Sequence, residues 1–193
     1  MFYSLLITAS FFTFSTDSLH PVKIEPPVTL NNKIVEAKIF CRKNGYDTGV
    51  CFLLDLSIHS GRKRFFICDM STDKIITSGL VTHGSCNTHY LSQVLYSDKP
   101  GCGCSSAGKY KVGNFYKGIF GDAYKLFGLE NSNRHAYERS IVLHSHSCVP
   151  DEEIYPNQIC NSQGCTTVSA AFLRTLETII LKKKKPILLW VLE

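Results

Sequence analysis

Residues 139–181 read RSIVLHSHSCVPDEEIYPNQICNSQGCTTVSAAFLRTLETIIL, and the rest of the chain can be understood from this stretch. It opens with an apolar, β-branched run that ends at His144, which is typical of a buried strand. A polar loop follows as far as Cys165. Apolar residues at helical spacing come next, with Ser169 as the expected N-cap. The stretch is therefore expected to form a strand, a loop and a helix in that order, and the loop can return the chain so that Cys165 lies near His144.

Strand patterns continue on both sides of this stretch. Helical spacing predicts one further helix near the N-terminus, with Asn31 or Asn32 as its N-cap and Gly45 at its end. Twelve Phe and nine Tyr also favour strands, so the residues predict one mainly β domain with two helices. Apolar runs between short polar turns predict strands at 50–56, 62–70, 74–83, 123–129, 139–145 and 187–193, and a Gly-punctuated hairpin at 109–118.

Length and charge limit the classes of function. The 193 residues suffice for one well-buried domain, and 44% hydrophobic with 19% charged residues indicates a folded globule. The net charge of +5 comes without a basic stripe interleaved with aromatic residues, so we expect no nucleic-acid partner. A polyanionic envelope polymer would suit this charge equally well. The four lysines at 182–185 favour solvated side chains that complement a helix C-terminus, with an anion-binding patch as the alternative.

The N-terminal residues have the composition of an export signal. Residues 1–14 are almost wholly apolar and uncharged, and they are short for a membrane-spanning helix. We interpret 1–19 as a secretory signal, 20–31 as a Pro-rich linker and 32–193 as the functional domain. No Lys or Arg precedes the apolar run and no A-x-A site follows it, so a buried first strand is the alternative.

Nine cysteines are many for this length. In an exported protein they indicate disulfides, with an odd cysteine left as a free thiol, for which Cys165 is our candidate. Cys102 and Cys104 are too close to pair easily with each other, so each would need a distant partner. Three cysteines lie inside apolar runs and are expected to be small core residues: Cys41, Cys51 and Cys68.

Cys165 and His144 are also candidates for nucleophilic catalysis. Gly164 allows close backbone approach, and the turn that it makes with Cys165 could hold an oxyanion ahead of a helix N-terminus. His144 could take the thiol proton while Ser145 orients its ring. Two alternatives remain: Cys165 pairs with Cys148 or Cys160, or a zinc site forms from His144, His146, Cys148, Cys160 and Cys165, although this spacing is irregular for a zinc module.

The same residues resemble a known family. His144, followed after a long gap by Ser162-Gln163-Gly164-Cys165, is similar to the His…Ser/Thr-His-Gly-Cys motif of YkuD-type L,D-transpeptidases. The similarity extends over roughly residues 30–193 and resembles a Bacteroidetes-like branch of murein L,D-transpeptidase catalytic domains. It is carried by SGLVTHGSCN (78–87), SSAGKYKVG (105–113), AYKLFGL (123–129), IVLHSHSCVPDEEIYP (141–156), ICNSQGCTTVS (159–169) and KPILLWVLE (185–193).

The resemblance implies a β-sandwich or barrel-like catalytic fold with two peripheral helices, and it assigns roles by position. Cys165 matches the nucleophile, His144 the base, and Ser145 the residue whose carbonyl orients that base. Gly164 and Cys165 match the oxyanion turn. Gln163 replaces the family's second histidine, so a cationic role at that position is in doubt. Further expectations are substrate contacts from Ser162, Gln163, Tyr110 and His83, with a structural role as the alternative for His83. Cys148 and Cys160 are extra to the family pattern and flank the site, and a disulfide between them could brace the intervening loop.

The activity that the resemblance implies is cysteine acyl transfer on peptidoglycan stem peptides, giving 3-3 cross-links through a Cys165 thioester. The alternatives are L,D-carboxypeptidase activity on the same substrate and a non-catalytic, disulfide-rich cell-wall-binding domain. We expect no metal and no organic cofactor. We also expect a monomer in the periplasm or cell envelope, in contact with a membrane only if the leader at 1–19 stays uncleaved.

Overall fold

The structure, a computed structural model, describes residues 28–193. The expected signal segment and most of the expected linker lie outside the described residues. Within them, no helix combines the length and apolarity needed to cross a bilayer. Two helices and eight strands follow one another along this part of the chain: α1 (Val28–Asn44), β1 (Val50–Asp55), β2 (Phe65–Asp69), β3 (Lys74–Gly79), β4 (Gly108–Gly118), β5 (Gly121–Gly128), β6 (Val142–Ser145), β7 (Thr166–Val168), α2 (Ala170–Ile180) and β8 (Leu188–Leu192).

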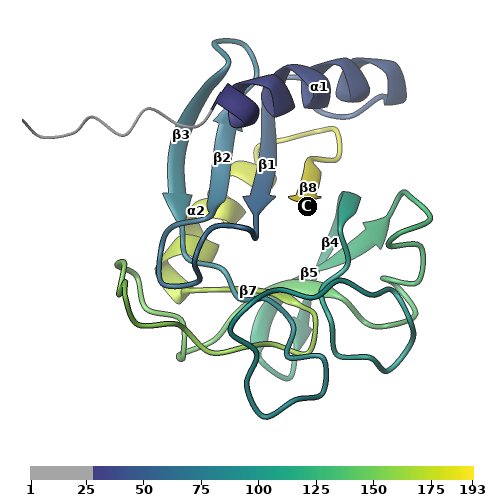
Figure 1. The fold of residues 1–193 in the computed structure, drawn as a ribbon. Coiled ribbons are helices and arrows are strands. Elements are labelled where there is room, and N and C mark those ends of the chain that lie inside the picture. Colours follow the sequence, from purple (N-terminus) through teal and green to yellow (C-terminus); the bar gives the residue numbers. More distant parts are fainter. Residues whose placement is uncertain (1–27) are drawn as a thin grey trace, which may run out of the picture.

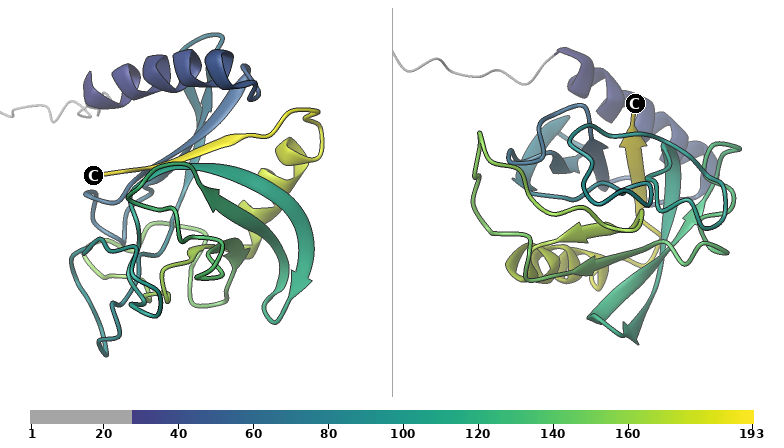
Figure 2. Two further views of the ribbon diagram at one scale, coloured as in Figure 1. Left: turned by 90° about the vertical axis from the view of Figure 1, so that its right-hand side faces the viewer. Right: turned by 60° about the horizontal axis from the view of Figure 1, so that its bottom comes forward.

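All eight strands form one mixed sheet in the order β3-β2-β1-β8-β4-β5-β6-β7 (Figure 1). The C-terminal strand β8 lies in its interior, parallel to β1 and antiparallel to β4. Beyond β3 the chain reaches the opposite edge of the sheet, where Val81 bridges Val168 and the Thr82 N–H donates to the Thr167 carbonyl at 3.0 Å. The two edges therefore meet, and the sheet curls into the barrel-like form that we expected (Figure 2).

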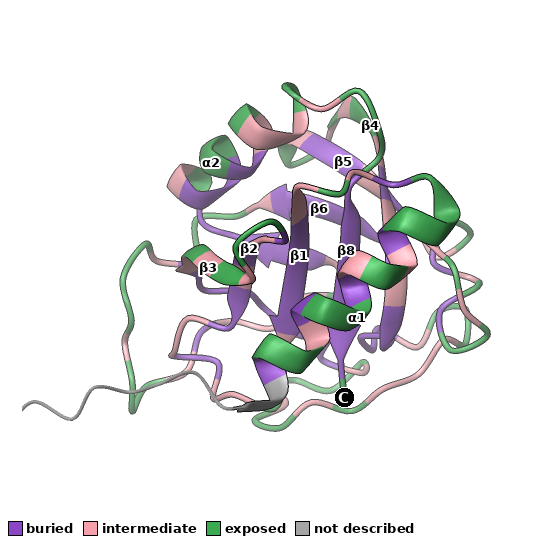
Figure 3. Cartoon of the chain, turned by 90° about the horizontal axis from the view of Figure 1, so that it is seen from above, coloured by how far each residue is buried: buried purple, intermediate pink, exposed green. Residues whose placement is uncertain are grey.

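The two faces of the sheet explain the two helices. In β1, Phe52 and Leu54 point to the inner core, whereas Cys51 and Leu53 point to the outer one. The inner core is completed by α2, whose Phe172 ring meets the ring of Phe65 at 5.2 Å between centroids. The outer core is covered by α1, which Figure 3 shows lying across β1 and β8. β8 serves both cores, and all five of its residues are buried.

The mainly β fold with two helices is confirmed, while several boundaries differ from prediction. Ser169 caps α2 as expected, because its side chain accepts the Phe172 N–H. The first helix already begins at Val28, so Asn31 and Asn32 lie within it and are not its N-cap. The predicted strand at 139–145 is shorter, since only Val142–Ser145 pairs.

The hairpin predicted within 109–118 is wrong. These residues form one continuous strand, β4, which pairs with β5 as far as Gly118 opposite Gly121. The register shifts between Val112 and Phe115, so the glycine at position 113 marks a bulge and not a turn. The actual turn is Ile119–Phe120.

Candidate active site

The candidate site lies where β6 and β7 run side by side. The two strands are parallel, with His144 opposite Thr167 in the register, and Cys165 comes directly before β7. Side chains from these strands and from the adjoining loops surround a pocket of about 220 Å³. Its lining is Thr82, Phe120, His144, His146, Cys148, Cys160, Asn161, Ser162, Gln163, Cys165 and Thr167. The fold thus brings the predicted nucleophile and base to one hollow.

The turn before the thiol depends on a glycine. Gly164 has a φ of +99°, and a Cβ at this position would lie 2.5 Å from the Cys104 carbonyl oxygen. Ser162 closes the turn, because its hydroxyl donates to the Cys165 carbonyl at 2.8 Å and accepts the Gly164 N–H at 3.2 Å. The Gly164 N–H is therefore engaged inside the turn, which leaves the Cys165 N–H as the better candidate to meet an oxyanion.

The Cys165 thiol is half-buried and free. Its Sγ points toward the Ser140 carbonyl oxygen at 3.8 Å. Burial raises the pKa of this thiol, while the Val142 backbone N–H and the charge of Arg139 act in the opposite direction. The net shift is upward, so the resting form at neutral pH is the thiol rather than the thiolate.

The His144 ring is buried, with both nitrogens in contact with protein. Nδ1 lies 3.0 Å from the Ser145 carbonyl oxygen, which can only accept, so Nδ1 carries the proton. Nε2 then has the lone pair, and the Thr167 hydroxyl donates to it at 3.0 Å. Burial lowers the pKa of His144, with a smaller contribution from His146, while the hydrogen bond to Ser145 raises it. The ring is thus neutral, with its unprotonated nitrogen, Nε2, hydrogen-bonded to Thr167.

Thr167 and Phe120 were missed by the sequence reasoning. No hydrogen bond joins Cys165 to His144 in the part of the chain that the structure describes, and the Thr167 hydroxyl occupies the base instead. Phe120, from the β4–β5 turn, stacks on the His144 ring at 4.9 Å between centroids. Thr167 could have been found from strand alternation, because it is two residues beyond Cys165. Phe120 carried no such signal.

Arg139 is a third residue that the sequence reasoning missed, and its contacts support the Gly164–Cys165 turn. Its side chain is only 3% exposed and pairs with Asp98 at 3.3 Å. The guanidinium also donates to the carbonyls of Ser97 and Cys104 and to the Ser106 hydroxyl. Because the Cys104 carbonyl packs against Gly164, Arg139 fixes the backbone on which the thiol rests.

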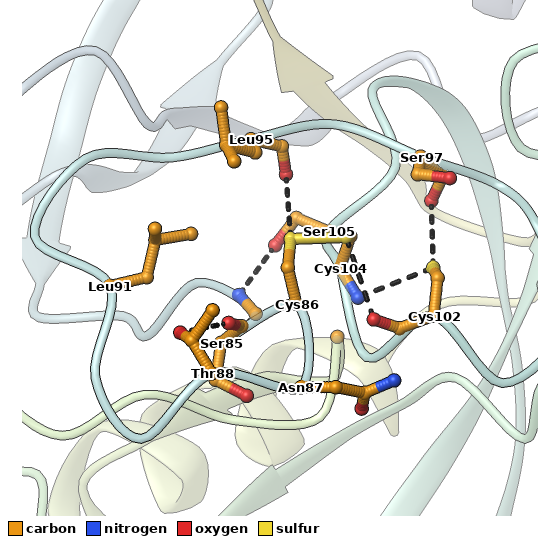
Figure 4. The surroundings of a disulfide bond; sticks show 12 residues. Ser85, Cys86, Asn87, Thr88, Leu91, Leu95, Ser97, Cys102, Cys104 and Ser105 are labelled. Carbon is orange, nitrogen blue, oxygen red and sulfur yellow. Dashed lines mark hydrogen bonds between the residues drawn. A yellow bond between two sulfur atoms is a disulfide. The ribbon is translucent and has the colours of Figure 1, made fainter.

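Two disulfides brace the surroundings of the site. Cys148 pairs with Cys160, one of the pairings that the sequence left open, and both line the pocket. Cys86 pairs with Cys104, beside the free thiol of Cys102 (Figure 4). Neither alternative pairing of Cys165 occurs. The alternative zinc set loses two thiolates to the first disulfide, and no metal-binding group of three or more His, Cys, Asp or Glu occurs within residues 28–193. Cys41, Cys51 and Cys68 are buried core residues, as predicted.

The predicted substrate contacts fall into two groups. Ser162 and Gln163 line the pocket, and the Gln163 amide donates to the Ser85 hydroxyl at 3.2 Å. Tyr110 is buried in the inner core, where its hydroxyl bonds Ser106. His83 is also buried, between the Arg64 guanidinium at 2.9 Å on Nδ1 and the Leu91 carbonyl at 2.9 Å on Nε2.

These contacts argue against a substrate role for His83 and Tyr110. Burial, together with the Arg64 charge, lowers the pKa of His83 to about 4, so this ring is neutral. Both of its nitrogens are already used by protein groups, which gives it a structural role. The Tyr110 hydroxyl is likewise committed inside the fold. Of the four expected substrate contacts, only Ser162 and Gln163 face the pocket.

A family model described as L,D-transpeptidase catalytic domain (YkuD_2) matches residues 27–190. The chain belongs to this family. No curated protein sequence matches the chain. Among solved structures, the Ldtfm–avibactam carbamoyl enzyme is similar, with a TM-score of 0.46, 10% identity, and coverage of 75% of this chain and 49% of that one. This chain therefore spans about half the length of that protein.

Two further solved structures are also similar to this chain at low identity. The L,D-transpeptidase (residues 123–326) of Xylanimonas cellulosilytica DSM 15894 aligns with a TM-score of 0.39 and 14% identity, covering 80% of this chain and 68% of that one. An L,D-transpeptidase from Mycobacterium smegmatis aligns with a TM-score of 0.43 and 11% identity, covering 75% and 59%. The Bacteroidetes-like branch remains a prediction.

Proposed function

We propose that this domain is a peptidoglycan L,D-transpeptidase in which Cys165 is the nucleophile and His144 is the general base. The observation that carries the proposal is a free thiol at the start of β7 in the same pocket as a neutral imidazole with an unprotonated Nε2. This combination, in a family of L,D-transpeptidase catalytic domains, fits acyl transfer better than it fits passive wall binding.

The first half-reaction forms a thioester. Rotation of the Cys165 side chain from Ser140 toward His144 lets Nε2 take the thiol proton as Sγ attacks. The attacked carbonyl is that of the L-centre of the third residue of a tetrapeptide stem. The C–N bond to the terminal D-Ala breaks, and the proton held by His144 passes to the departing amine. The Cys165 N–H donates to the oxyanion during this step.

The second half-reaction decides the product. An amine from a neighbouring stem gives up a proton to His144 and attacks the thioester carbonyl. The C–S bond breaks, Sγ is reprotonated, and a 3-3 cross-link results. In this scheme deprotonation of the attacking group accompanies attack, so His144 acts as a general base in both half-reactions.

The runner-up is L,D-carboxypeptidase activity, with water in place of the acceptor amine. The pocket beside Cys165 is partly open to solvent, so water as well as an amine could reach the thioester. We also infer export to the cell envelope, because two disulfides suit an oxidising compartment. The segment 1–19 is the proposed signal, and a monomer remains our expectation.

Product analysis tests this function. Residues 28–193 are incubated with disaccharide-tetrapeptide muropeptides beside Cys165→Ala and His144→Ala, and the products are analysed by mass spectrometry. A dimer that has lost one D-Ala, absent with both variants, supports transpeptidation. Loss of D-Ala without dimer moves the function to carboxypeptidase. No turnover under reducing or oxidising conditions contradicts catalysis and supports the non-catalytic wall-binding alternative.

A further inference from the structure

A basic groove of about 410 Å³ lies outside the candidate active site. It is formed by β4, β5, the end of α2 and the α2–β8 loop. In Figure 2 the ribbon of this loop lies beside that of the β4–β5 hairpin. The α2–β8 loop is held in place, because the Val112 N–H donates to the Ile187 carbonyl at 3.1 Å and the Asp47 N–H to the Pro186 carbonyl at 2.9 Å. The lining residues are Lys111, Val112, Gly113, Asn114, Phe127, Ile180, Lys183, Lys184, Lys185, Pro186 and Ile187.

Most of the positive charge of this groove is uncompensated. Lys183 pairs with Asp47 at 3.1 Å. No other carboxylate within residues 28–193 forms an ion pair with Lys111, Lys184 or Lys185. Lys184 and Lys185 are exposed. Three ammonium groups of one groove without a carboxylate partner raise the local positive potential, which an anionic ligand would relieve.

Aromatic rings hold two lysines of this surface in place. The Lys111 ammonium lies 4.6 Å from the centroid of Phe127. Phe127 stacks on Tyr137 at 5.1 Å with an angle of 11° between the rings. The Lys125 ammonium lies 4.8 Å from the other ring of the pair, Tyr137. Side chains that are ordered before binding lose less conformational entropy when an anion arrives, so this stack favours binding.

The aromatic–lysine stack leads back toward Cys165. A smaller pocket of about 200 Å³ contains Lys125 and Tyr137 together with Ser140 and Val142. Ser140 supplies the carbonyl that the Cys165 Sγ faces, and the Val142 N–H lies against the same thiol. Basic and aromatic groups therefore extend from the backbone of Ser140 and Val142, which contacts the Cys165 thiol, to the groove.

We propose that the Lys111–Lys184–Lys185 groove is an exosite for the carboxylates of peptidoglycan stem peptides neighbouring the stem that enters the active site. The proposal rests on the proposed function. A cross-linked wall is a polymer that repeats stem-peptide carboxylates. Carboxylates beyond the reacting stem would meet these ammonium groups, so intact wall would bind more tightly than a soluble muropeptide. Screening in salt confines such attraction to about 8 Å, which makes direct contact in the groove necessary.

Binding to sedimented sacculi tests the exosite without requiring turnover. The Cys165→Ala protein is mixed with sacculi stripped of phosphate polymers by hydrofluoric acid, and the bound fraction is measured against sacculus concentration. Lys184→Glu/Lys185→Glu should raise the half-saturating concentration about tenfold, since two attractions become repulsions. The matched control is Lys74→Glu/Lys99→Glu, which makes the same change of net charge at exposed positions and should leave binding near that of the parent.

Several outcomes would overturn the exosite. Equal loss in both double variants would mean attraction by net charge alone. Binding equal to that of the parent in both double variants would mean that the groove makes no contact with the sacculus. Binding only to sacculi that keep their phosphate polymers would assign the groove to another polymer. Sacculi with carboxylates converted to methylamides should lose the binding advantage, and unchanged binding would again overturn the exosite.

The active Lys184→Glu/Lys185→Glu enzyme separates this proposal from the proposed function. On a soluble tetrapeptide muropeptide it should turn over like the parent, because neither lysine belongs to the catalytic machinery, and on sacculi its KM should rise. If the parent binds sacculi through the groove but shows no turnover, the transpeptidase assignment is overturned and the exosite stands. Turnover by both enzymes, with no effect of the variant on the KM for sacculi, would keep the transpeptidase assignment and overturn the exosite.

Discussion

The Thr167 hydroxyl donates a hydrogen bond of 3.0 Å to Nε2 of His144, the nitrogen that takes up the thiol proton in the proposed mechanism. The opposite nitrogen is fixed by the Ser145 carbonyl, so the ring is oriented from both ends. In the proposed mechanism Thr167 is a positioning residue, because its hydroxyl favours the neutral imidazole and holds the ring in place until the thiol turns toward it.

Thr167→Val should move the acidic limb of the pH profile of kcat/KM to higher pH. The hydroxyl stabilises the neutral ring, so its loss raises the pKa of His144, which burial otherwise lowers. Activity needs the neutral base and falls as the pH drops through this pKa, so the limb shifts upward. Thr178→Val is the control, because that exposed hydroxyl bonds only the Arg174 carbonyl of its own helix. If the acidic limb of the Thr167→Val profile stays at the parent's pH, the Thr167 hydroxyl does not lower the pKa of His144.

Gly164→Ala should cost more stability than Gly45→Ala and should remove activity. Both glycines have a positive φ, which strains any L side chain by about 1–2 kcal/mol. At Gly45 nothing lies within 4 Å of the added Cβ, whereas at Gly164 the Cys104 carbonyl lies at 2.5 Å. That clash adds roughly 1–3 kcal/mol and displaces Cys165. Urea unfolding and muropeptide turnover check both variants. Equal losses of stability with activity retained would contradict the tight turn.

Arg139→Met should raise the pKa of Cys165, since the Arg139 charge acts to lower it. The inflection of iodoacetamide alkylation against pH would then move upward. Loss of the guanidinium also removes one partner of Asp98, which keeps the His135 backbone N–H at 2.9 Å, so the unfolding free energy should fall by about 1–3 kcal/mol.

Arg139→Lys separates charge from geometry. It keeps the positive charge, so its inflection should stay near that of the parent, although it loses the forked contacts to the surrounding carbonyls. Arg134→Met, at an exposed position, is the control for net charge. If Arg139→Met and Arg134→Met shift the inflection equally, a specific effect of Arg139 is excluded.

Cys148→Ser/Cys160→Ser should destabilise the domain by about 3 kcal/mol, because the disulfide closes a short loop in the unfolded chain. Both residues line the pocket, so kcat/KM should fall as well. Guanidinium unfolding measures the stability. Cys102→Ser removes a cysteine that forms no disulfide and should behave like the parent. A double variant as stable as the parent would show that the loop is held by other contacts.

The sequence predicted those parts of the site that depend on local pattern. A β-branched run ending at His144, the Gly164–Cys165 turn and the cap at Ser169 each follow from neighbouring residues. Arg139 could not be found in this way, because its contacts with Ser97 and Cys104 are made between segments far apart along the chain.

The errors have the same physical origin. Asn31 and Asn32 have good N-cap chemistry, but α1 begins before them and packs over β1 and β8. The glycine at 113 looked like a turn because only pairing with β5 shows that the strand continues through a bulge. The expectation that His83 and Tyr110 contact substrate came from motif position, which does not reveal that both side chains are buried.

The central claim is that Cys165 carries the acyl group, and trapping that intermediate tests it most directly. The domain is mixed with a disaccharide-tetrapeptide, quenched in acid within seconds, and analysed by intact mass and peptide mapping. We predict an adduct equal to the muropeptide minus D-Ala on the peptide that contains Cys165, sensitive to hydroxylamine, and strongly reduced in His144→Ala. An adduct on another residue, or turnover that persists in Cys165→Ala, would contradict the account.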